Sequence, residues 1–438
     1  MSSPSTIYAL STASGRSAIA VVRISGPAAG CALRMLGGKT DAPRKATLET
    51  LVDPVAGHPL DQALTLWFPA PSSETGEDIA ELHLHGGGAV ITSVLRALGQ
   101  MDQLEPAGPG DFARRAFHNG KLNLTRIEAL SDLISAETEA QRAQAVRQLQ
   151  GALSDLYDRW RAELIVCLAH IEVAVDFTDE DIPGDIIAVA LREICTLEAD
   201  IGRHLNDNRC GERVRSGYRV VIAGPPNAGK SSLLNALAQR DVAIVSDEPG
   251  TTRDVIDVVL DLGGFPVTVS DTAGIRDGVG NVEAEGVRRA QDRMKDADIV
   301  LWLRDITSPR APAVPKEFSA KSIEVWSKGD LSAGPIDSCI ISTRKDNGLD
   351  DLVDLLLLRV SVDTDRAFEG PLLTRARHRY AVERAHAALS RSMICDVSQP
   401  EIIAEELRGA THALGSITGR VDVEDLLGAI FSEFCIGK

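Results

Sequence analysis

The sequence is poor in aromatic residues and has no long apolar run. Phe, Trp and Tyr make up only 4% of the 438 residues, so a packed core has to depend mainly on aliphatic side chains. A transmembrane helix needs roughly 18–20 consecutive apolar residues, and residues 1–8 show no basic stretch that leads into an apolar core. We therefore expect no membrane span and no secretory signal.

Cysteines are few and scattered, which argues against a disulfide framework. They form no CxxC pair, and their number is odd, as is typical of reduced thiols. We therefore expect a cytoplasmic protein. The seven residues are Cys31, Cys167, Cys195, Cys210, Cys339, Cys395 and Cys435.

Positive charge is also in deficit, because the formal net charge is −17. This argues against a protein that coats nucleic acid through a general positive field, but it leaves room for a local basic patch.

The length predicts two to four domains. Short apolar runs broken by Gly and Pro predict a β-rich domain over 1–118. Helical periodicity follows over 119–216, with one apolar stripe from Val146 to Ile171 and a second from Ile187 to Leu205. Alternating strands and helices predict an α/β domain over 217–372, and helices return over 373–438.

Two arrangements of these segments are open. An amphipathic helix pair buries its stripe poorly alone, so we expect the helices on both sides of the α/β domain to pack together, with that domain inserted between them. Independent helical domains joined in series are the alternative. The predicted fold class is a multidomain α+β and α/β protein with a discontinuous helical domain and an inserted Ras-like P-loop domain.

A phosphate-binding loop is the strongest motif. The segment Gly224-Pro-Pro-Asn-Ala-Gly-Lys-Ser231 follows an apolar strand and opens a helix, which is the context that a P-loop requires. Backbone N–H groups and the helix N-terminus would bind phosphates, Lys230 would reach the β- and γ-phosphates, and Ser231 would ligate Mg²⁺. The predicted contacts are Asn227, Ala228, Gly229, Lys230, Ser231 and Ser232.

Two shorter motifs accompany the P-loop in the order seen in GTPases. Asp271-Thr272-Ala273-Gly274 follows an apolar strand and places a carboxylate near the magnesium site. Thr252, in the segment Gly250–Asp254, would close on Mg²⁺ when the γ-phosphate is present.

The base is expected to be guanine. GTPases recognise it through an Asn-Lys-x-Asp motif, and here Ser327-Lys328-Gly329-Asp330 follows a strand, with Ser327 in place of the usual Asn. The Asp330 carboxylate would accept hydrogen bonds from the base, so GTP is favoured over ATP, and a P-loop ATPase is the alternative. Ser342-Thr343-Arg344 would cover the base.

The residue that positions the attacking water is not evident. Ras-like enzymes place a Gln just after the Asp-x-x-Gly segment, but this chain has Ile275. Glu283 and Glu285, a few residues downstream, are both candidates.

The flanking segments resemble the MnmE (TrmE) family of tRNA-modification GTPases almost from end to end. The matching segments are Val21–Pro27, Thr75–Asp78, His85–Gly87, Pro109–Phe112, Arg115–Leu124 and Phe434–Lys438. The resemblance implies an N-terminal domain that binds 5,10-methylene- or 5-formyl-tetrahydrofolate, and a homodimer. It also implies a FAD-dependent partner, MnmG (GidA), in a heterotetramer or larger assembly, and an aminomethyl-type modification at C5 of the wobble uridine of certain tRNAs.

The resemblance also implies roles for particular residues. Glu283 corresponds to the catalytic Glu, which acts with Lys230, and Cys435 is a candidate nucleophile with buried packing as its alternative. A K⁺ ion stimulates hydrolysis in the family, and its ligands would be Asn227, Ser246, Glu248 and Thr251. The folate site would include Arg23, Glu81, Lys121 and Lys438.

A rival function is a regulatory GTPase switch in RNA or ribosome assembly, without one-carbon chemistry. Roles for the local basic residues also remain open, whether tRNA phosphates, the folate tail or solvated surface. They are Arg114, Arg115, His118, Lys121 and Arg126.

Overall fold

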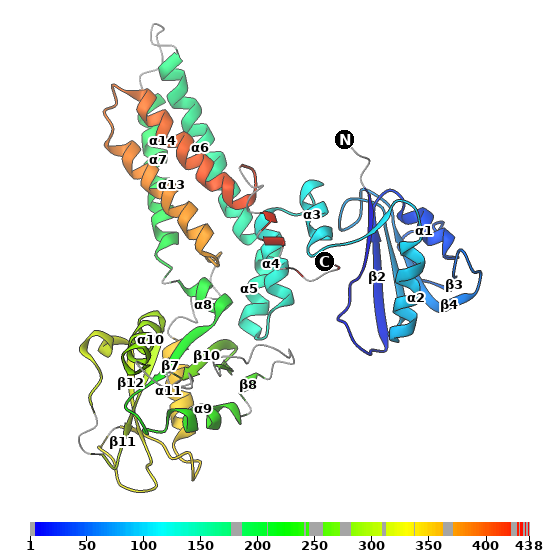
Figure 1. Ribbon diagram of the computed structural model, residues 1–438. Helices are drawn as coiled ribbons and strands as arrows, with labels where there is room; N and C mark the ends of the chain where they lie inside the picture. Colours follow the sequence, from blue (N-terminus) through cyan, green and yellow to red (C-terminus); the bar gives the residue numbers. More distant parts are fainter. Residues whose placement is uncertain are drawn as a thin grey trace. The chain divides into compact units, whose positions relative to one another are not determined.

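Figure 1 shows a computed structural model of the chain, which divides into two compact units. The first comprises residues 1–131 and 415–438, and the second residues 132–414. The structure describes residues 5–176, 186–207, 209–240, 242–244, 257–271, 282–308, 312–336, 338–361 and 371–421, with 427, 428, 430, 431, 434 and 437; within these, the side chains of 282–287 and 289 are not described.

A six-stranded mixed sheet forms the centre of the first unit, in the order β3-β4-β5-β2-β1-β6. Its strands alternate, so that Val22 and Ile24 of β2 are fully buried while Val21 and Arg23 are partly exposed. Helices α1 and α2 cover the buried face. The elements are β1 (Thr6–Leu10), β2 (Ile19–Ser25), α1 (Ala29–Met35), β3 (Thr47–Val52), β4 (Pro59–Phe68), β5 (Ile79–His85), α2 (Gly88–Gly99) and β6 (Leu104–Pro106).

The C-terminal residues return to this unit. Phe431 and Phe434 pack with residues of α3 (Asp111–His118) and α4 (Leu124–Ile134) in one apolar cluster. Gly437 lies so close to β1 that a Cβ there would be 2.3 Å from the Leu10 carbonyl oxygen. The chain end therefore lies within the same unit as β1, β2 and α3.

Long helices form one part of the second unit, where α6, α7, α13 and α14 lie side by side (Figure 1). Ser390 of α13 donates to Glu198 of α7, and Arg408 of α14 pairs with Glu172 of α6. The helices are α5 (Glu139–Leu149), α6 (Ala152–Asp176), α7 (Ile186–Leu205), α8 (Cys210–Ser216), α13 (Ala376–Ile394) and α14 (Pro400–Thr418). No helix in the described part of the chain is long and apolar enough to cross a bilayer.

The stripe predicted from Val146 to Ile171 is divided between two helices. The helical conformation is interrupted at Gln150–Gly151, between α5 and α6. The Ser154 hydroxyl, in the first turn of α6, donates to the Gly151 carbonyl at 3.0 Å. Apolar periodicity alone could not show this break, because the stripe continues across it.

A seven-stranded sheet forms the other part of the second unit, in the order β13-β12-β11-β7-β10-β9-β8. The strands from β13 to β10 are parallel to one another, and β9 pairs antiparallel with both β10 and β8. Apolar clusters lie on both faces, as expected for a parallel sheet between helices. The elements are β7 (Tyr218–Ala223), α9 (Lys230–Ala238), β8 (Ala243–Ile244), β9 (Asp257–Leu262), β10 (Phe265–Asp271), α10 (Val282–Asp296), β11 (Ile299–Asp305), η1 (Lys316–Lys321), β12 (Ser322–Ser327), β13 (Cys339–Ile340) and α11 (Leu349–Ser361).

A tight turn joins β9 to β10 and contacts the helices. Gly263 and Gly264 have φ of 63° and 89°, as a two-residue hairpin with both central residues in the left-handed region requires. The Ala140 amide of α5 donates to the Gly264 carbonyl at 3.1 Å. The sheet is thus attached to α5 at the end of the hairpin whose second strand leads to Asp271.

The chain enters and leaves this sheet domain at one place. Asp132 binds both Arg215, just before β7, and Arg375, just before α13, at 2.9 and 2.7 Å. With α7 and α13 in contact, the two ends of the domain are close together, as expected for an insertion. The predicted fold class is confirmed.

Candidate functional site

The P-loop lies between β7 and α9, as predicted from the sequence. Gly224 passes so close to β11 that a Cβ would be 2.4 Å from the Leu303 carbonyl oxygen, so only glycine fits there. Asn227 adopts a left-handed conformation with φ of 61°, which is uncommon outside glycine. The loop therefore presents its backbone in a form that few other residue types would permit.

Lys230, Ser231 and Asp271 meet at the carboxyl end of β10. The Ser231 hydroxyl donates to Asp271 Oδ2 at 2.6 Å, and Lys230 Nζ donates to the Gly224 and Pro225 carbonyls at 3.1 and 3.0 Å. Burial lowers the pKa of Lys230, although the Asp271 charge partly opposes this. A hydroxyl and a carboxylate side by side are oxygen ligands of the kind that Mg²⁺ prefers.

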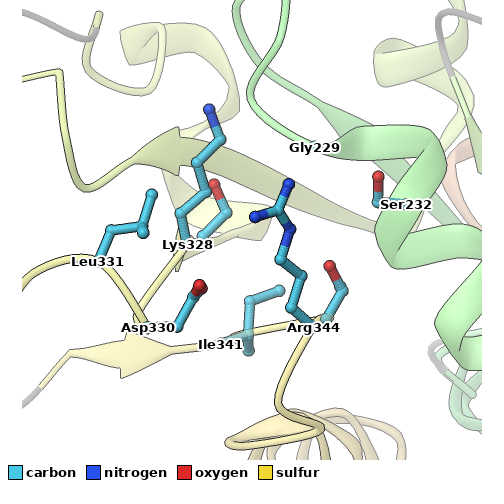
Figure 2. A pocket seen from close by; sticks show the side chains of 9 residues that line it. Gly229, Ser232, Lys328, Asp330, Leu331, Ile341 and Arg344 are labelled. Carbon is cyan, nitrogen blue, oxygen red and sulfur yellow. The ribbon is translucent and has the colours of Figure 1, made fainter.

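A cavity of about 260 Å³ opens beside the P-loop (Figure 2). Residues after β12 and β13 form its walls, where the carboxyl ends of parallel strands meet. The lining residues are Gly229, Ser232, Ser327, Lys328, Asp330, Leu331, Ile341, Thr343 and Arg344.

Asp330 is held in place within this cavity. The Ser342 hydroxyl donates to its Oδ1 at 2.8 Å, and this bond lowers the pKa of the Asp330 carboxyl below its ordinary value. The carboxyl group is therefore ionised at neutral pH and is available to accept hydrogen bonds from a ligand.

Ser327 and Lys328 attach this wall to neighbouring segments. Ser327 Oγ donates to the Ala228 carbonyl of the P-loop at 2.6 Å, and the Lys328 ammonium pairs with Asp305 at the end of β11. Burial alone would raise the pKa of Asp305, but hydrogen bonds from Lys328 and Thr307 outweigh it and lower the pKa. The phosphate and base ends of the site are thus directly connected.

Three contacts at this site were not anticipated from the sequence. The first is the pairing of Asp305 with Lys328. Asp305 is the last residue of β11, at the same sheet edge as Ser327, and this position could have suggested that Asp305 lies at the site. Arg240 binds Asp346 and Asp350, which follow the Ser342 segment, and Arg293 Nη1 donates to the Asp271 carbonyl at 3.2 Å. Neither arginine belongs to a motif, so only the fold reveals it.

The predicted folate residues of the first unit lie partly together. Arg23 and Glu81 are partners across β2 and β5, and Arg23 Nη2 donates to Glu81 Oε1 at 2.8 Å. Arg23 also pairs with Glu74 at 2.7 Å. Glu74 and Gly76 belong to the loop between β4 and β5. A Cβ at Gly76 would lie 3.1 Å from Lys121 Cε, so Lys121 lies beside this loop.

Arg115 does not contribute to an exposed basic surface. Its guanidinium donates to the carbonyls of Ser5 and Ser25 and to Glu77 Oε2, and its side chain is 17% exposed. Its contacts connect the chain start, β2 and the loop before β5.

Several predicted site residues lie outside the described part of the chain. For Glu283, only the helical backbone of the first turn of α10 is described. The others are Ser246, Glu248, Thr251, Thr252, Thr272, Ala273, Gly274, Cys435 and Lys438.

Comparison with known proteins gives full-length matches. The model of the "MnmE helical domain" matches residues 124–435, and that of the "GTP-binding protein TrmE N-terminus" matches residues 6–121. The "tRNA modification GTPase MnmE" of Parvibaculum lavamentivorans is 53% identical over 440 residues, with 99% of this chain and 100% of the relative covered. The human mitochondrial "5-taurinomethyluridine-[tRNA] synthase subunit GTPB3" is 46% identical, with 100% and 94% covered. With this coverage and the P-loop geometry described above, the chain belongs to the MnmE (TrmE) family of tRNA modification GTPases.

Proposed function

We propose that this protein hydrolyses GTP to drive modification of the wobble uridine of tRNA at C5, with a tetrahydrofolate-borne one-carbon unit. The observation that carries the nucleotide part is the connected site in which Ser231 meets Asp271 at one end and Ser342 holds Asp330 at the other. One end suits a magnesium-bound phosphate chain and the other a base with hydrogen-bond donors.

At the phosphate end, the P-loop amides and Lys230 bind the β- and γ-phosphates. Ser231, Asp271 and Thr252 would hold Mg²⁺, and the bound ion would offset the negative charge of the phosphates. Thr272, Ala273 and Gly274 follow Asp271 and would contact the γ-phosphate.

At the base end, Asp330 accepts hydrogen bonds from the guanine N1–H and 2-amino groups. The stem of Lys328 packs along the base, and Thr343 and Arg344 cover it. Adenine presents an acceptor at N1 and no 2-amino group, so the same carboxylate disfavours ATP.

Glu283 is the proposed water-orienting residue. It lies in the first turn of α10, the helix that follows Asp271 and Ile275 along the chain. We expect Glu283→Ala to lower kcat for GTP about a hundredfold while the Kd for GTP changes less than twofold, since general-base groups act on the transition state.

The matched control is Glu285→Ala, which should hydrolyse GTP normally. In cells that lack the gene, the wild-type chain and Glu285→Ala should restore the modified wobble nucleoside in tRNA, measured by mass spectrometry, and Glu283→Ala should not. Equal loss of GTP binding and hydrolysis in Glu283→Ala would contradict the assignment. Normal wobble nucleosides in the deletion strain would contradict the proposed function.

Asn227 is the proposed P-loop ligand of a K⁺ ion, with Ser246, Glu248 and Thr251 from the following segment. Its left-handed backbone supports a special role, because uncommon conformations persist at functional positions. A cation beside the phosphates stabilises the same charge as an arginine finger.

We expect hydrolysis to be about a hundredfold faster in potassium than in sodium at equal ionic strength, since one preorganised electrostatic contact in the transition state contributes about 10²–10³ in kcat. Asn227→Ala should bring the ratio near one. Asn235→Ala, an exposed residue of α9, should leave it unchanged. Equal rates in the two salts for the wild-type chain would exclude the potassium site.

The folate site is proposed in the first unit, around Arg23, Glu81 and Lys121. These supply cationic groups for a glutamate tail and a carboxylate for the amino donors of a pterin. Gly437 lies against β1, and its neighbours along the chain, Cys435 and Lys438, are proposed to complete the site.

The proposed assembly is a homodimer that acts with the FAD-dependent MnmG (GidA) on tRNA in the cytoplasm. The name of the human relative describes it as a subunit of a synthase, which supports a second protein in the reaction.

A further inference from the structure

The single hydroxyl proton of Ser327 already has a partner. The side chain is buried, with the residue 5% exposed, and its oxygen lies 2.6 Å from the Ala228 carbonyl oxygen and 3.3 Å from the Arg304 carbonyl oxygen. Both neighbours are acceptors, so whichever of them takes the proton, Ser327 presents only lone pairs toward the cavity.

Guanine carries both donors and acceptors, which have opposite requirements. Its N1–H and 2-amino groups are donors and need an acceptor, which the Asp330 carboxylate supplies. Its O6 and N7 atoms are acceptors and need donors. An asparagine at position 327 would carry two amide hydrogens, one for the Ala228 carbonyl and one for N7, whereas the Ser327 hydroxyl has only the first.

One of the two cations that line this cavity, Lys328, is also engaged. The Lys328 ammonium is paired with Asp305, so its charge is directed toward β11. Arg344 is the second cation that lines the cavity (Figure 2), and the proposed function assigns it to cover the base.

We propose that this site recognises guanine through its N1–H and 2-amino groups and leaves N7 without a hydrogen bond. The proposal rests on the guanine-binding role of Asp330 in the proposed function. It follows that the substrates are purine triphosphates with N1–H and a 2-amino group, whichever atom occupies position 7. Ser327 then serves as a connection between the base wall and the P-loop.

The test compares the binding of GDP, 7-deaza-GDP and IDP to the full chain in Mg²⁺ by titration calorimetry. We expect the Kd values of GDP and 7-deaza-GDP to agree within twofold. IDP lacks the 2-amino group and should bind at least about tenfold more weakly, the factor that one hydrogen bond to a charged group supplies. A tenfold preference for GDP over 7-deaza-GDP would overturn the proposal.

Two variants test whether Ser327 is the reason that N7 receives no hydrogen bond. Ser327→Asn should acquire a preference of about tenfold for GDP over 7-deaza-GDP and bind GDP more tightly. Ser327→Ala should weaken both nucleotides equally, because it removes only the bond to Ala228. A folded Ser327→Asn protein without the preference would overturn the assignment to Ser327, and if this variant does not fold, the wild-type ratio alone decides.

Failure of the two proposals is distinguishable. If IDP binds as tightly as GDP, the role of Asp330 in the proposed function is wrong. If IDP binds weakly and 7-deaza-GDP does too, only the present inference fails.

Discussion

Replacing Asp330 by asparagine is expected to invert the base preference of the site. The affinity for GTP should fall about 10³-fold, because two hydrogen bonds to a charged acceptor are lost, each contributing about 1.5–3 kcal/mol. The affinity for xanthosine triphosphate should rise, since its carbonyl at C2 accepts a hydrogen bond from the new amide. Nucleotide competition against a fluorescent analogue would measure both.

Ser342→Ala is the matched control for this inversion. It removes the hydroxyl that lies 2.8 Å from Asp330 Oδ1 but leaves the carboxylate. We expect GTP to bind several-fold more weakly, with guanine still preferred to xanthine. Unchanged GTP affinity in Asp330→Asn would show that another residue recognises the base.

The sequence was sufficient to predict that the motif segments converge, because they follow strands of one parallel sheet. Once β7, β10, β12 and β13 belong to one parallel sheet, the segments at their carboxyl ends converge, and Asp330 comes within hydrogen-bond distance of Ser342. The order of the strands was not needed for this prediction, because every parallel strand ends at the same edge.

Contacts that depend on strand order or on helix packing could not be predicted. Lys328 pairs with Asp305 because β11 adjoins β12, and the position of Arg115 depends on three segments that meet around it. The break at Gly151 was also missed, because an apolar stripe shows which face is buried but not where a helix ends.

Arg379 gives the largest stability effect that we expect outside the nucleotide site. Its side chain is 10% exposed and donates to Glu212 at 2.6 Å, to Asp207 at 2.7 Å and to the Leu205 carbonyl at 3.1 Å. These contacts join α13 to the end of α7 and to α8, which leads into β7. Arg379 therefore connects the helices that precede the inserted domain to those that follow it.

Arg379→Met preserves much of the side-chain volume but removes the nearest cation from two carboxylates of low exposure, Asp207 and Glu212, and Glu212 keeps only Arg209, at 3.9 Å. Breaking a buried ion pair in this way costs about 3–5 kcal/mol of unfolding free energy. The matched control is Arg391→Met on the same helix, where the arginine is 55% exposed and pairs with Glu406 at 2.7 Å. That exposed pair should contribute about 1 kcal/mol or less.

Urea denaturation followed by circular dichroism would measure the unfolding free energy of the two variants. A multidomain chain need not unfold in one step, so amide hydrogen exchange in α7, α8 and α13 would show whether the transition belongs to the helices. GDP affinity should be unchanged in both variants, since neither arginine lines the nucleotide cavity. If Arg379→Met loses no more stability than Arg391→Met, the contacts of Arg379 do not stabilise the connection of α13 to α7 and α8.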